Sequence, residues 1–180
     1  MTPLGSANPW SSLDLVKHFY FGGGRALSLE EIGHLKAVVE HYRDHHGAFR
    51  RVAGQVADAA RSKMDGSFVY DYARTYGFRP IAWVHGDAVV SGYFQGNVRS
   101  HQGMLSVEGN CFFDFSDVFT DPTDLMKLIR VEKPQDLPLA VRLGSDLLGT
   151  AFHVFGNWYT RLNARFQVNR THSRFTKETQ

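Results

Sequence analysis

The sequence predicts an α+β protein in which an N-terminal helical segment packs on a curved antiparallel β-sheet or partial β-barrel. Two observations support this fold class. Apolar residues recur at helical spacing in the first third of the chain, and they alternate with polar residues over long stretches after residue 65. The chain has 180 residues, 43% of them hydrophobic, which is enough for one domain with a substantial core.

The composition narrows the classes of function. The formal net charge is only +2 and the basic residues are scattered, so we expect no nucleic-acid partner. The single cysteine, Cys111, falls on an apolar strand face, which predicts an inert buried thiol and no intramolecular disulfide. No signal peptide and no apolar run of transmembrane length is visible, so we expect the protein to be secreted from its producer without a signal peptide.

We expect one domain between two less ordered ends. Residues 1–9 are predicted to be a flexible lead, 10–168 a single domain, and 169–180 a polar tail. Within the domain, residues 10–64 are expected to be mainly helical and 65–168 mainly β, with a short helix near 122–130.

Three helices are expected before residue 65. The first covers residues 13–20 and ends at three consecutive glycines, which interrupt helices. The second begins at a capping box formed by Ser28 and Glu31, and Gly47 divides it from the third. The third covers residues 49–64.

The second part of the chain contains the predicted strands: 67–72, 78–85, 88–99, 103–115 and 152–168. Tight turns between the first four indicate an antiparallel meander. In the last strand the even-numbered residues are mostly apolar and the odd-numbered residues polar, so one face is expected to be buried.

The fourth strand runs into an acidic cluster. It contains Asp114, Asp117, Asp121 and Asp124, and we expect the strand to end in a turn before Pro122. Asp117 is expected to lie beyond the regular strand pairing, with its side chain free to point into a site at the rim of the sheet. Such carboxylates can bind a divalent cation or act as general acid and base. Alternatively they are turn and helix-cap residues, a common role for aspartate.

The polar face of the last strand adds further candidates: His153, Tyr159, Arg161 and Arg165. If this strand lies near the acidic turn, guanidinium groups, carboxylates and a divalent ion would converge there. This combination suits phosphoryl or pyrophosphoryl chemistry, because the cations neutralise developing negative charge. The alternative is a solvated strand face with cross-strand charge pairs.

The histidines of the second predicted helix form another possible metal site. His41 and His45 are four residues apart, as in the zinc-binding His-Glu-x-x-His motif, but no glutamate directly follows the first histidine. His34 lies two turns earlier. The sequence therefore shows an incomplete ligand set for a metal.

Several segments together resemble the toxic C-terminal domains of bacterial polymorphic and type VI secretion effectors. The order of predicted elements is similar over most of residues 10–168. The segments are SSLDLVKHFYFGGGRALSLEEIGHL, SFVYDY, VSGYFQGNV, GMLSVEGNCFFDFSDVFTDPTDL and GTAFHVFGNWYTRLNARF. Within that group, the order of β-hairpins, acidic turn and closing strand is similar to the activity domain of colicin M.

The resemblance implies an activity. Colicin M-like bacteriocins cut the peptidoglycan precursor lipid II between its lipid and its pyrophosphate, in the periplasm, with a divalent ion. Their motif is Asp-x-Tyr-Asp followed shortly by His-Arg. Here Asp117 takes the place of the first Asp. Phe119 and Thr120 stand in the places of the Tyr and the second Asp, and Met126 and Lys127 stand near that of His-Arg.

This departure leaves two alternatives: either Asp121 and distant residues supply the missing groups, or the chemistry differs. The candidate catalytic residues are Asp117, Asp121, His85, His101 and Arg161. The candidate substrate-binding residues are Arg165, Tyr159 and His153, and the candidate ligands for Mg²⁺ or Ca²⁺ are Asp117 and Asp121.

Two functions are consistent with these observations. The first is a secreted antibacterial hydrolase that attacks a cell-envelope phosphate linkage, lipid II above all, in the target periplasm, with a cognate immunity protein as partner. The second is a non-enzymatic toxin or binding module that docks on an envelope component. The acidic turn and the resemblance support the first, which is the function that we expect. The high aromatic content and the incomplete motif support the second.

Overall fold

The fold is α+β, as predicted. The computed structural model describes residues 8–44, 47–82, 85–120 and 149–167, so the helix predicted near 122–130 and the predicted tail lie outside the described residues. The helices are α1 (Ser12–Phe21), α2 (Leu35–Asp44) and α3 (Ala48–Lys63). The strands are β1 (Leu27–Ser28), β2 (Gly66–Gly77), β3 (Asp87–His101), β4 (Met104–Phe119) and β5 (Phe152–Gln167).

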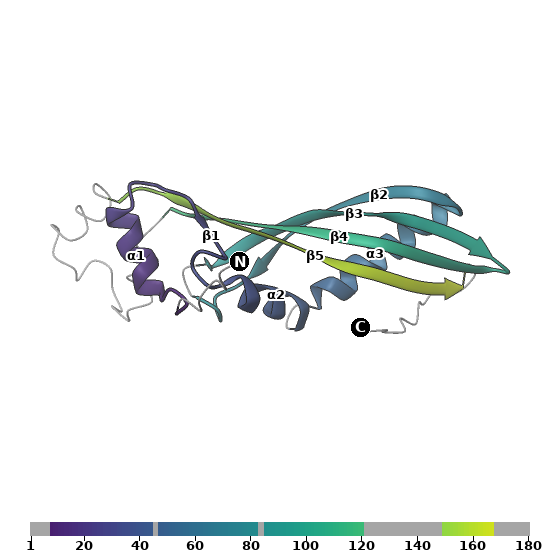
Figure 1. Cartoon of the computed structure of the whole chain (residues 1–180), viewed down its shortest axis with the longest axis horizontal. Coiled ribbons are helices and arrows are strands. Elements are labelled where there is room, and N and C mark those ends of the chain that lie inside the picture. The colour runs from purple at the N-terminus through teal and green to yellow at the C-terminus, as the bar shows by residue number, and fades with distance from the viewer. Residues whose placement is uncertain (1–7, 45–46, 83–84, 121–148, 168–180) are drawn as a thin grey trace, which may run out of the picture. The chain divides into compact units, whose positions relative to one another are not determined.

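In the described ranges the strands form one five-stranded sheet in the order β1-β5-β4-β3-β2 (Figure 1). The edge strand β1 is an element that the alternation did not predict. Leu27 pairs with Val154, and Ser28 with Phe155, parallel to β5, so the sheet is mixed rather than wholly antiparallel. A two-residue strand is too short to show a periodic pattern in the sequence.

The chain divides into two compact units. Unit 1 consists of Met1–Val39, Thr75–Val89 and Phe115–Gly156. Unit 2 consists of Glu40–Arg74, Val90–Asp114 and Asn157–Gln180. Strands β2 to β5 therefore contribute residues to both units.

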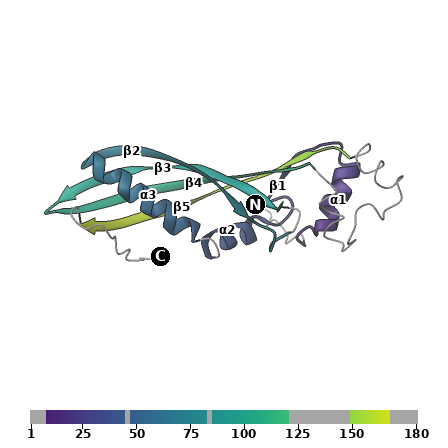
Figure 2. The same ribbon diagram turned by 180° about the vertical axis from the view of Figure 1, so that it is seen from behind.

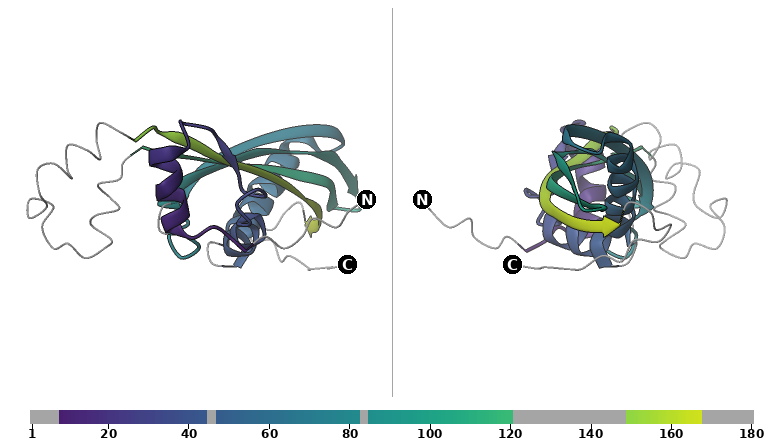
Figure 3. Two further views of the ribbon diagram at one scale, coloured as in Figure 1. Left: turned by 60° about the vertical axis from the view of Figure 1, so that its left-hand side comes forward. Right: turned by 90° about the vertical axis from the view of Figure 1, so that its right-hand side faces the viewer.

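The core of unit 2 is aromatic and is centred on Phe113. Its ring stacks on Trp158 with 5.3 Å between centroids and contacts Tyr42 at 5.4 Å. Helix α3 lies along one face of the sheet in this unit (Figures 1 and 2), and the strands curve around it (Figure 3). Cys111 is buried in the same core, as predicted, and burial raises the pKa of its thiol to about 12, so the thiolate is not available near neutral pH.

Unit 1 contains α1 and a second aromatic cluster. A capping box begins α1, because the Ser11 hydroxyl accepts from the Asp14 N–H and the Asp14 carboxylate accepts from the Ser11 N–H. Phe119 packs against both Phe19 and Phe152, with 5.3 Å between ring centroids in each pair. None of the helices in the described ranges is both long and apolar enough to cross a membrane.

Residues 78–82 and 85, the described part of the strand predicted over 78–85, do not form a strand. They turn the chain instead: the Ile81 N–H donates to the Phe78 carbonyl, and the His85 N–H donates to the carbonyl three residues before it. Pro80 has no backbone N–H and cannot join a sheet ladder in the interior of a strand. The segment resembles a strand in sequence because several of its residues are nevertheless buried.

Helix α2 begins at Leu35, later than the capping box predicted. The Ser28 hydroxyl does accept from the Glu31 N–H, as that box requires. However, the Leu29 N–H donates to a carbonyl of β5, and Gly33 has a φ of +73°, which is outside the helical region. The local cap therefore closes a turn between the sheet and the helix.

Candidate functional site

The acidic stretch begins inside a strand rather than in a turn. Strand β4 continues to Phe119, so our prediction that regular pairing ends before Asp117 is wrong. Asp117 is in phase with Phe115 and Phe119, whose side chains are buried, and its own side chain is only 11% exposed. Asp114 lies on the opposite, exposed face of the strand. A carboxylate at an inward strand position needs a polar partner, because burial without one is costly.

That partner is His85, which precedes β3. Its Nδ1 lies 3.4 Å from Oδ2 of Asp117, and its side chain is 0% exposed. The ring of Phe115 packs edge-on against the imidazole, with 5.7 Å between centroids. Among the described residues the Nδ1 atom has no hydrogen-bond partner, since 3.4 Å exceeds the usual N–H···O distance. A buried nitrogen that faces a carboxylate without a hydrogen bond is a candidate for a functional role.

His34 fixes the other nitrogen of His85. Nδ1 of His34 lies 2.9 Å from Nε2 of His85, and Nε2 of His34 lies 2.7 Å from the carbonyl oxygen of Trp10. A carbonyl can only accept, so Nε2 of His34 carries a proton and donates it to Trp10. Burial and the neighbouring His85 lower the pKa of His34, which favours its neutral form. Nδ1 of neutral His34 then accepts the hydrogen bond from the Nε2–H of His85.

These hydrogen bonds leave Nδ1 of His85 facing Asp117. If neither atom carried a proton, a lone pair and a carboxylate oxygen would repel each other in a buried site. One shared proton removes this repulsion, as a carboxylate beside an imidazolium or as a carboxylic acid beside a neutral imidazole. The arrangement thus lets Asp117, which is partly exposed, act as an acid or as a base.

We expect acidification to destabilise the fold through His34. Its pKa is below the ordinary value of 6.5 because of burial, so below about pH 6.5 the unfolded chain binds more protons than the folded one. Stability is therefore complete above that pH and decreases as the pH falls towards the lowered pKa. The contribution is at most about 1.4 kcal/mol per pH unit. Urea unfolding at about pH 7.5 and about pH 5.5 measures it.

The matched variants for this measurement are His34→Gln and His153→Gln. Glutamine at position 34 does not titrate but can still donate to the Trp10 carbonyl, so the loss of stability at low pH should become smaller. His153 is exposed on β5 in the same unit, and its replacement should leave the pH dependence nearly unchanged. Equal pH dependence of the wild type and His34→Gln would contradict this account.

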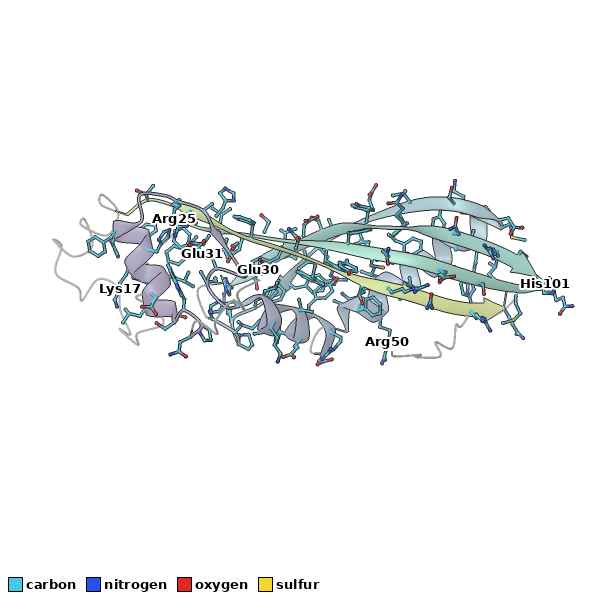
Figure 4. The ribbon with its side chains drawn as sticks, viewed as in Figure 1. Lys17, Arg25, Glu30, Glu31, Arg50 and His101 are labelled. Carbon is cyan, nitrogen blue, oxygen red and sulfur yellow. The ribbon has the colours of Figure 1, made fainter. Side chains whose placement is uncertain are left out.

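The other predicted site residues have different environments. Four of them belong to unit 2: His101, Tyr159, Arg161 and Arg165. His101 lies at the end of β3 (Figure 4), and Arg161 forms an exposed ion pair with Glu108. His153 is exposed on β5, and Asp121 lies outside the described residues. Of the predicted catalytic residues, the structure therefore brings together His85 and Asp117.

The described residues do not complete a metal site. No group of three or more His, Cys, Asp or Glu side chains in these ranges could hold a metal ion. Asp117 can offer one carboxylate, whereas Asp121, the second predicted ligand, lies outside the described residues. In the His41 and His45 alternative, His45 lies outside the described residues.

Our site prediction named His34 only beside the possible His41 and His45 metal site and missed its contact with His85. His34 lies one turn before Val38 and two turns before His41, and all three side chains are buried. A histidine on the apolar stripe of a helix must find a polar partner in the core. That stripe was the available signal, although it could not identify His85 as the partner.

The protein is thus an α+β protein with two buried histidines in contact, His34 and His85. His85 in turn faces the partly exposed carboxylate of Asp117. A scan against known protein families finds no match, and neither does a search of curated proteins. Among solved structures, the chain is similar to pectocin M2, with a TM-score of 0.40 and 12% sequence identity. The match covers 87% of this chain and 53% of the pectocin M2 chain, so this chain spans about half the length of that protein. At this level the likeness is distant and assigns neither substrate nor reaction.

Proposed function

We propose that this protein is a secreted antibacterial toxin domain that hydrolyses a phosphate linkage of the cell envelope, with lipid II as the favoured substrate. The observation that carries the proposal is the pairing of Asp117 with the buried His85. His34 contacts the other ring nitrogen of His85. The substrate class comes from the resemblance of the sequence to colicin M-like activity domains.

The proposed chemistry is general acid–base hydrolysis. Water adds across the bond between the lipid and the pyrophosphate, which gives the lipid alcohol and a pyrophosphate-bearing saccharide. Asp117 contacts the reacting atoms and exchanges a proton with them, and His85 holds the compensating charge or proton. His34 is a positioning residue, because it acts on Asp117 only through His85.

The proposal extends to location and partners. The protein acts in the periplasm of the target cell and is neutralised in the producer by an immunity protein. A divalent cation, Mg²⁺ or Ca²⁺, bound through Asp117 and Asp121 is part of the proposal, but no step described above depends on it.

Directed expression in a bacterium tests the proposed function. We expect the chain to lyse cells when a cleavable leader sends it to the periplasm, and to be harmless in the cytoplasm. The physical reason is access, because the pyrophosphate bond of lipid II faces the periplasm on the outer leaflet of the inner membrane. Culture density and colony counts after induction measure the effect.

The control is the same periplasmic fusion carrying Asp117→Asn, with both proteins quantified by immunoblot. Toxicity confined to cytoplasmic expression would overturn the proposal and would indicate a nucleotide or nucleic-acid target. Purified protein incubated with lipid II in detergent should release the pyrophosphate-bearing saccharide, which chromatography can detect.

A second candidate is a binding module without catalysis, and one observation favours it. Helix α1 exposes two large apolar side chains, Leu13 at 57% and Phe21 at 86%. They lie at the two ends of the helix, about 80° apart around its axis, and could contact an apolar envelope component. This function predicts that Asp117→Asn kills as well as the wild type does.

A further inference from the structure

Unit 2 carries a polar depression that the proposed function does not use. It has a volume of about 610 Å³, within the range of small-molecule sites. The side chains that line it come from four neighbouring strands: Ser67, Gln95, Asn97, Glu108, Asn110 and Arg161. We call this set the amide row, because three of its members are carboxamides.

Two facing glycines also line the depression. A Cβ atom on Gly96 would lie 2.3 Å from the carbonyl oxygen of Glu108, and one on Gly109 would lie 2.4 Å from that of Gln95. Neither position can therefore carry a side chain without moving a strand. Peptide groups thus contribute directly to the lining between β3 and β4.

The charges of the amide row compensate each other. The guanidinium of Arg161 donates a hydrogen bond to the carboxylate of Glu108, and both side chains are well exposed. A phosphate or other anion would have to compete with Glu108 for Arg161. The carboxamides supply donors and acceptors without net charge. The lining is therefore suited to an uncharged ligand with many hydrogen-bonding groups.

An aromatic ladder borders the amide row. The ring of Phe112 stacks on Tyr93, with 4.8 Å between centroids and 25° between planes, and lies 6.2 Å from the ring of Tyr159. Each of these three aromatic residues lies two positions along its strand from a member of the amide row. Side chains two residues apart in a strand point to the same face, so the aromatic ladder and the amide row share one face of the sheet. Tyr159 is 71% exposed and offers an aromatic surface to a ligand.

We propose that the amide row and Tyr159 form a binding site for an uncharged saccharide. A pyranose ring combines an apolar face of C–H groups, which packs on an aromatic ring, with hydroxyls that both donate and accept hydrogen bonds. Nucleic acids also stack on aromatic rings, but their phosphates need uncompensated cations. The site belongs wholly to unit 2 and does not depend on the proposed function.

Titration of the ¹⁵N-labelled full chain with cellotriose and with triacetylchitotriose, followed by NMR, tests the proposal. At least one of the two neutral trisaccharides should shift the backbone amides of Gly96, Gly109 and Asn110 in a saturable way at millimolar concentrations. Inorganic phosphate and oligothymidylate should not shift them. No saturable shift with either sugar, or stronger shifts with phosphate or oligothymidylate, would overturn the proposal.

Two variants locate the binding. Tyr159→Ala should weaken the affinity at least about fivefold, because it removes the stacking surface from an exposed position where the fold tolerates the change. Asn110→Ala should also weaken it, through the lost amide hydrogen bonds. Phe155→Ala is the matched control, since this exposed aromatic residue lies on the same strand as Tyr159 but belongs to unit 1. Equal affinity of Tyr159→Ala and the wild type would exclude the site.

Discussion

Replacing Asp117 by Asn is expected to reduce killing by periplasmic protein at least about 100-fold, the contribution typical of a general acid or base. The fold should be retained, because the asparagine amide is of equal size and can donate a hydrogen bond to the bare Nδ1 of a neutral His85. The amide of the Asp117→Asn variant would thus give Nδ1 of His85 a hydrogen bond, but it could not exchange a proton with a substrate. Colony counts measure killing, and circular dichroism with urea unfolding measures the fold.

Asp114→Asn is the matched control for this experiment. It makes the same chemical change on the same strand, but Asp114 lies on the exposed face rather than the inward one. We expect it to kill nearly as well as the wild type. Full killing by well-folded Asp117→Asn protein would leave the acid–base mechanism without support and would favour the binding module.

The largest effect on stability is expected for Gly92→Ala. A Cβ atom at Gly92 would lie 1.8 Å from the carbonyl oxygen of Phe112 on the neighbouring strand, and its φ of +157° is one that other residues rarely adopt. The two strands would have to separate next to Phe113, the centre of the aromatic core of unit 2. We expect the free energy of unfolding to fall by about 3 kcal/mol or more.

Gly54→Ala gives the matched comparison in the same unit. A Cβ atom at Gly54 would meet nothing within 4 Å, and the residue lies inside helix α3. Alanine should therefore raise the free energy of unfolding by about 0.5–1 kcal/mol, because glycine is a poor helix former. Urea unfolding measures both variants. Similar stability of the two would show that the strands at Gly92 can separate at little cost.

Long helices and strands could be predicted from the sequence, because their apolar residues repeat with a regular spacing and form one buried face. The even-numbered apolar residues at both ends of β5 are buried, from Phe152 to Phe166, as their alternation predicts. Helices α1 and α3 also lie close to their predicted ranges. Residues 78–85 misled the prediction because an apolar turn and a short strand have the same composition.

The candidate site was predictable only in part. Asp117 and His85 were identified as separate candidates, but Asp117 was assigned to a turn, which is the commonest setting for aspartate. Its phase with Phe115 and Phe119 indicated an inward position, and the strand does continue to Phe119. The contact between His34 and His85 depends on the fold of unit 1, and no local pattern encodes it.

His34 and His85 are 51 residues apart in the chain, and they meet through a 2.9 Å hydrogen bond. Bringing such distant residues together requires closing a long loop, and the entropy lost in doing so is recovered only when the surrounding contacts form. A chain in transit in an extended state would therefore have Asp117 without its imidazole neighbour. Catalysis in the proposed mechanism would begin only once refolding had joined the N-terminal segment to the sheet, so delivery and activation would be separate events.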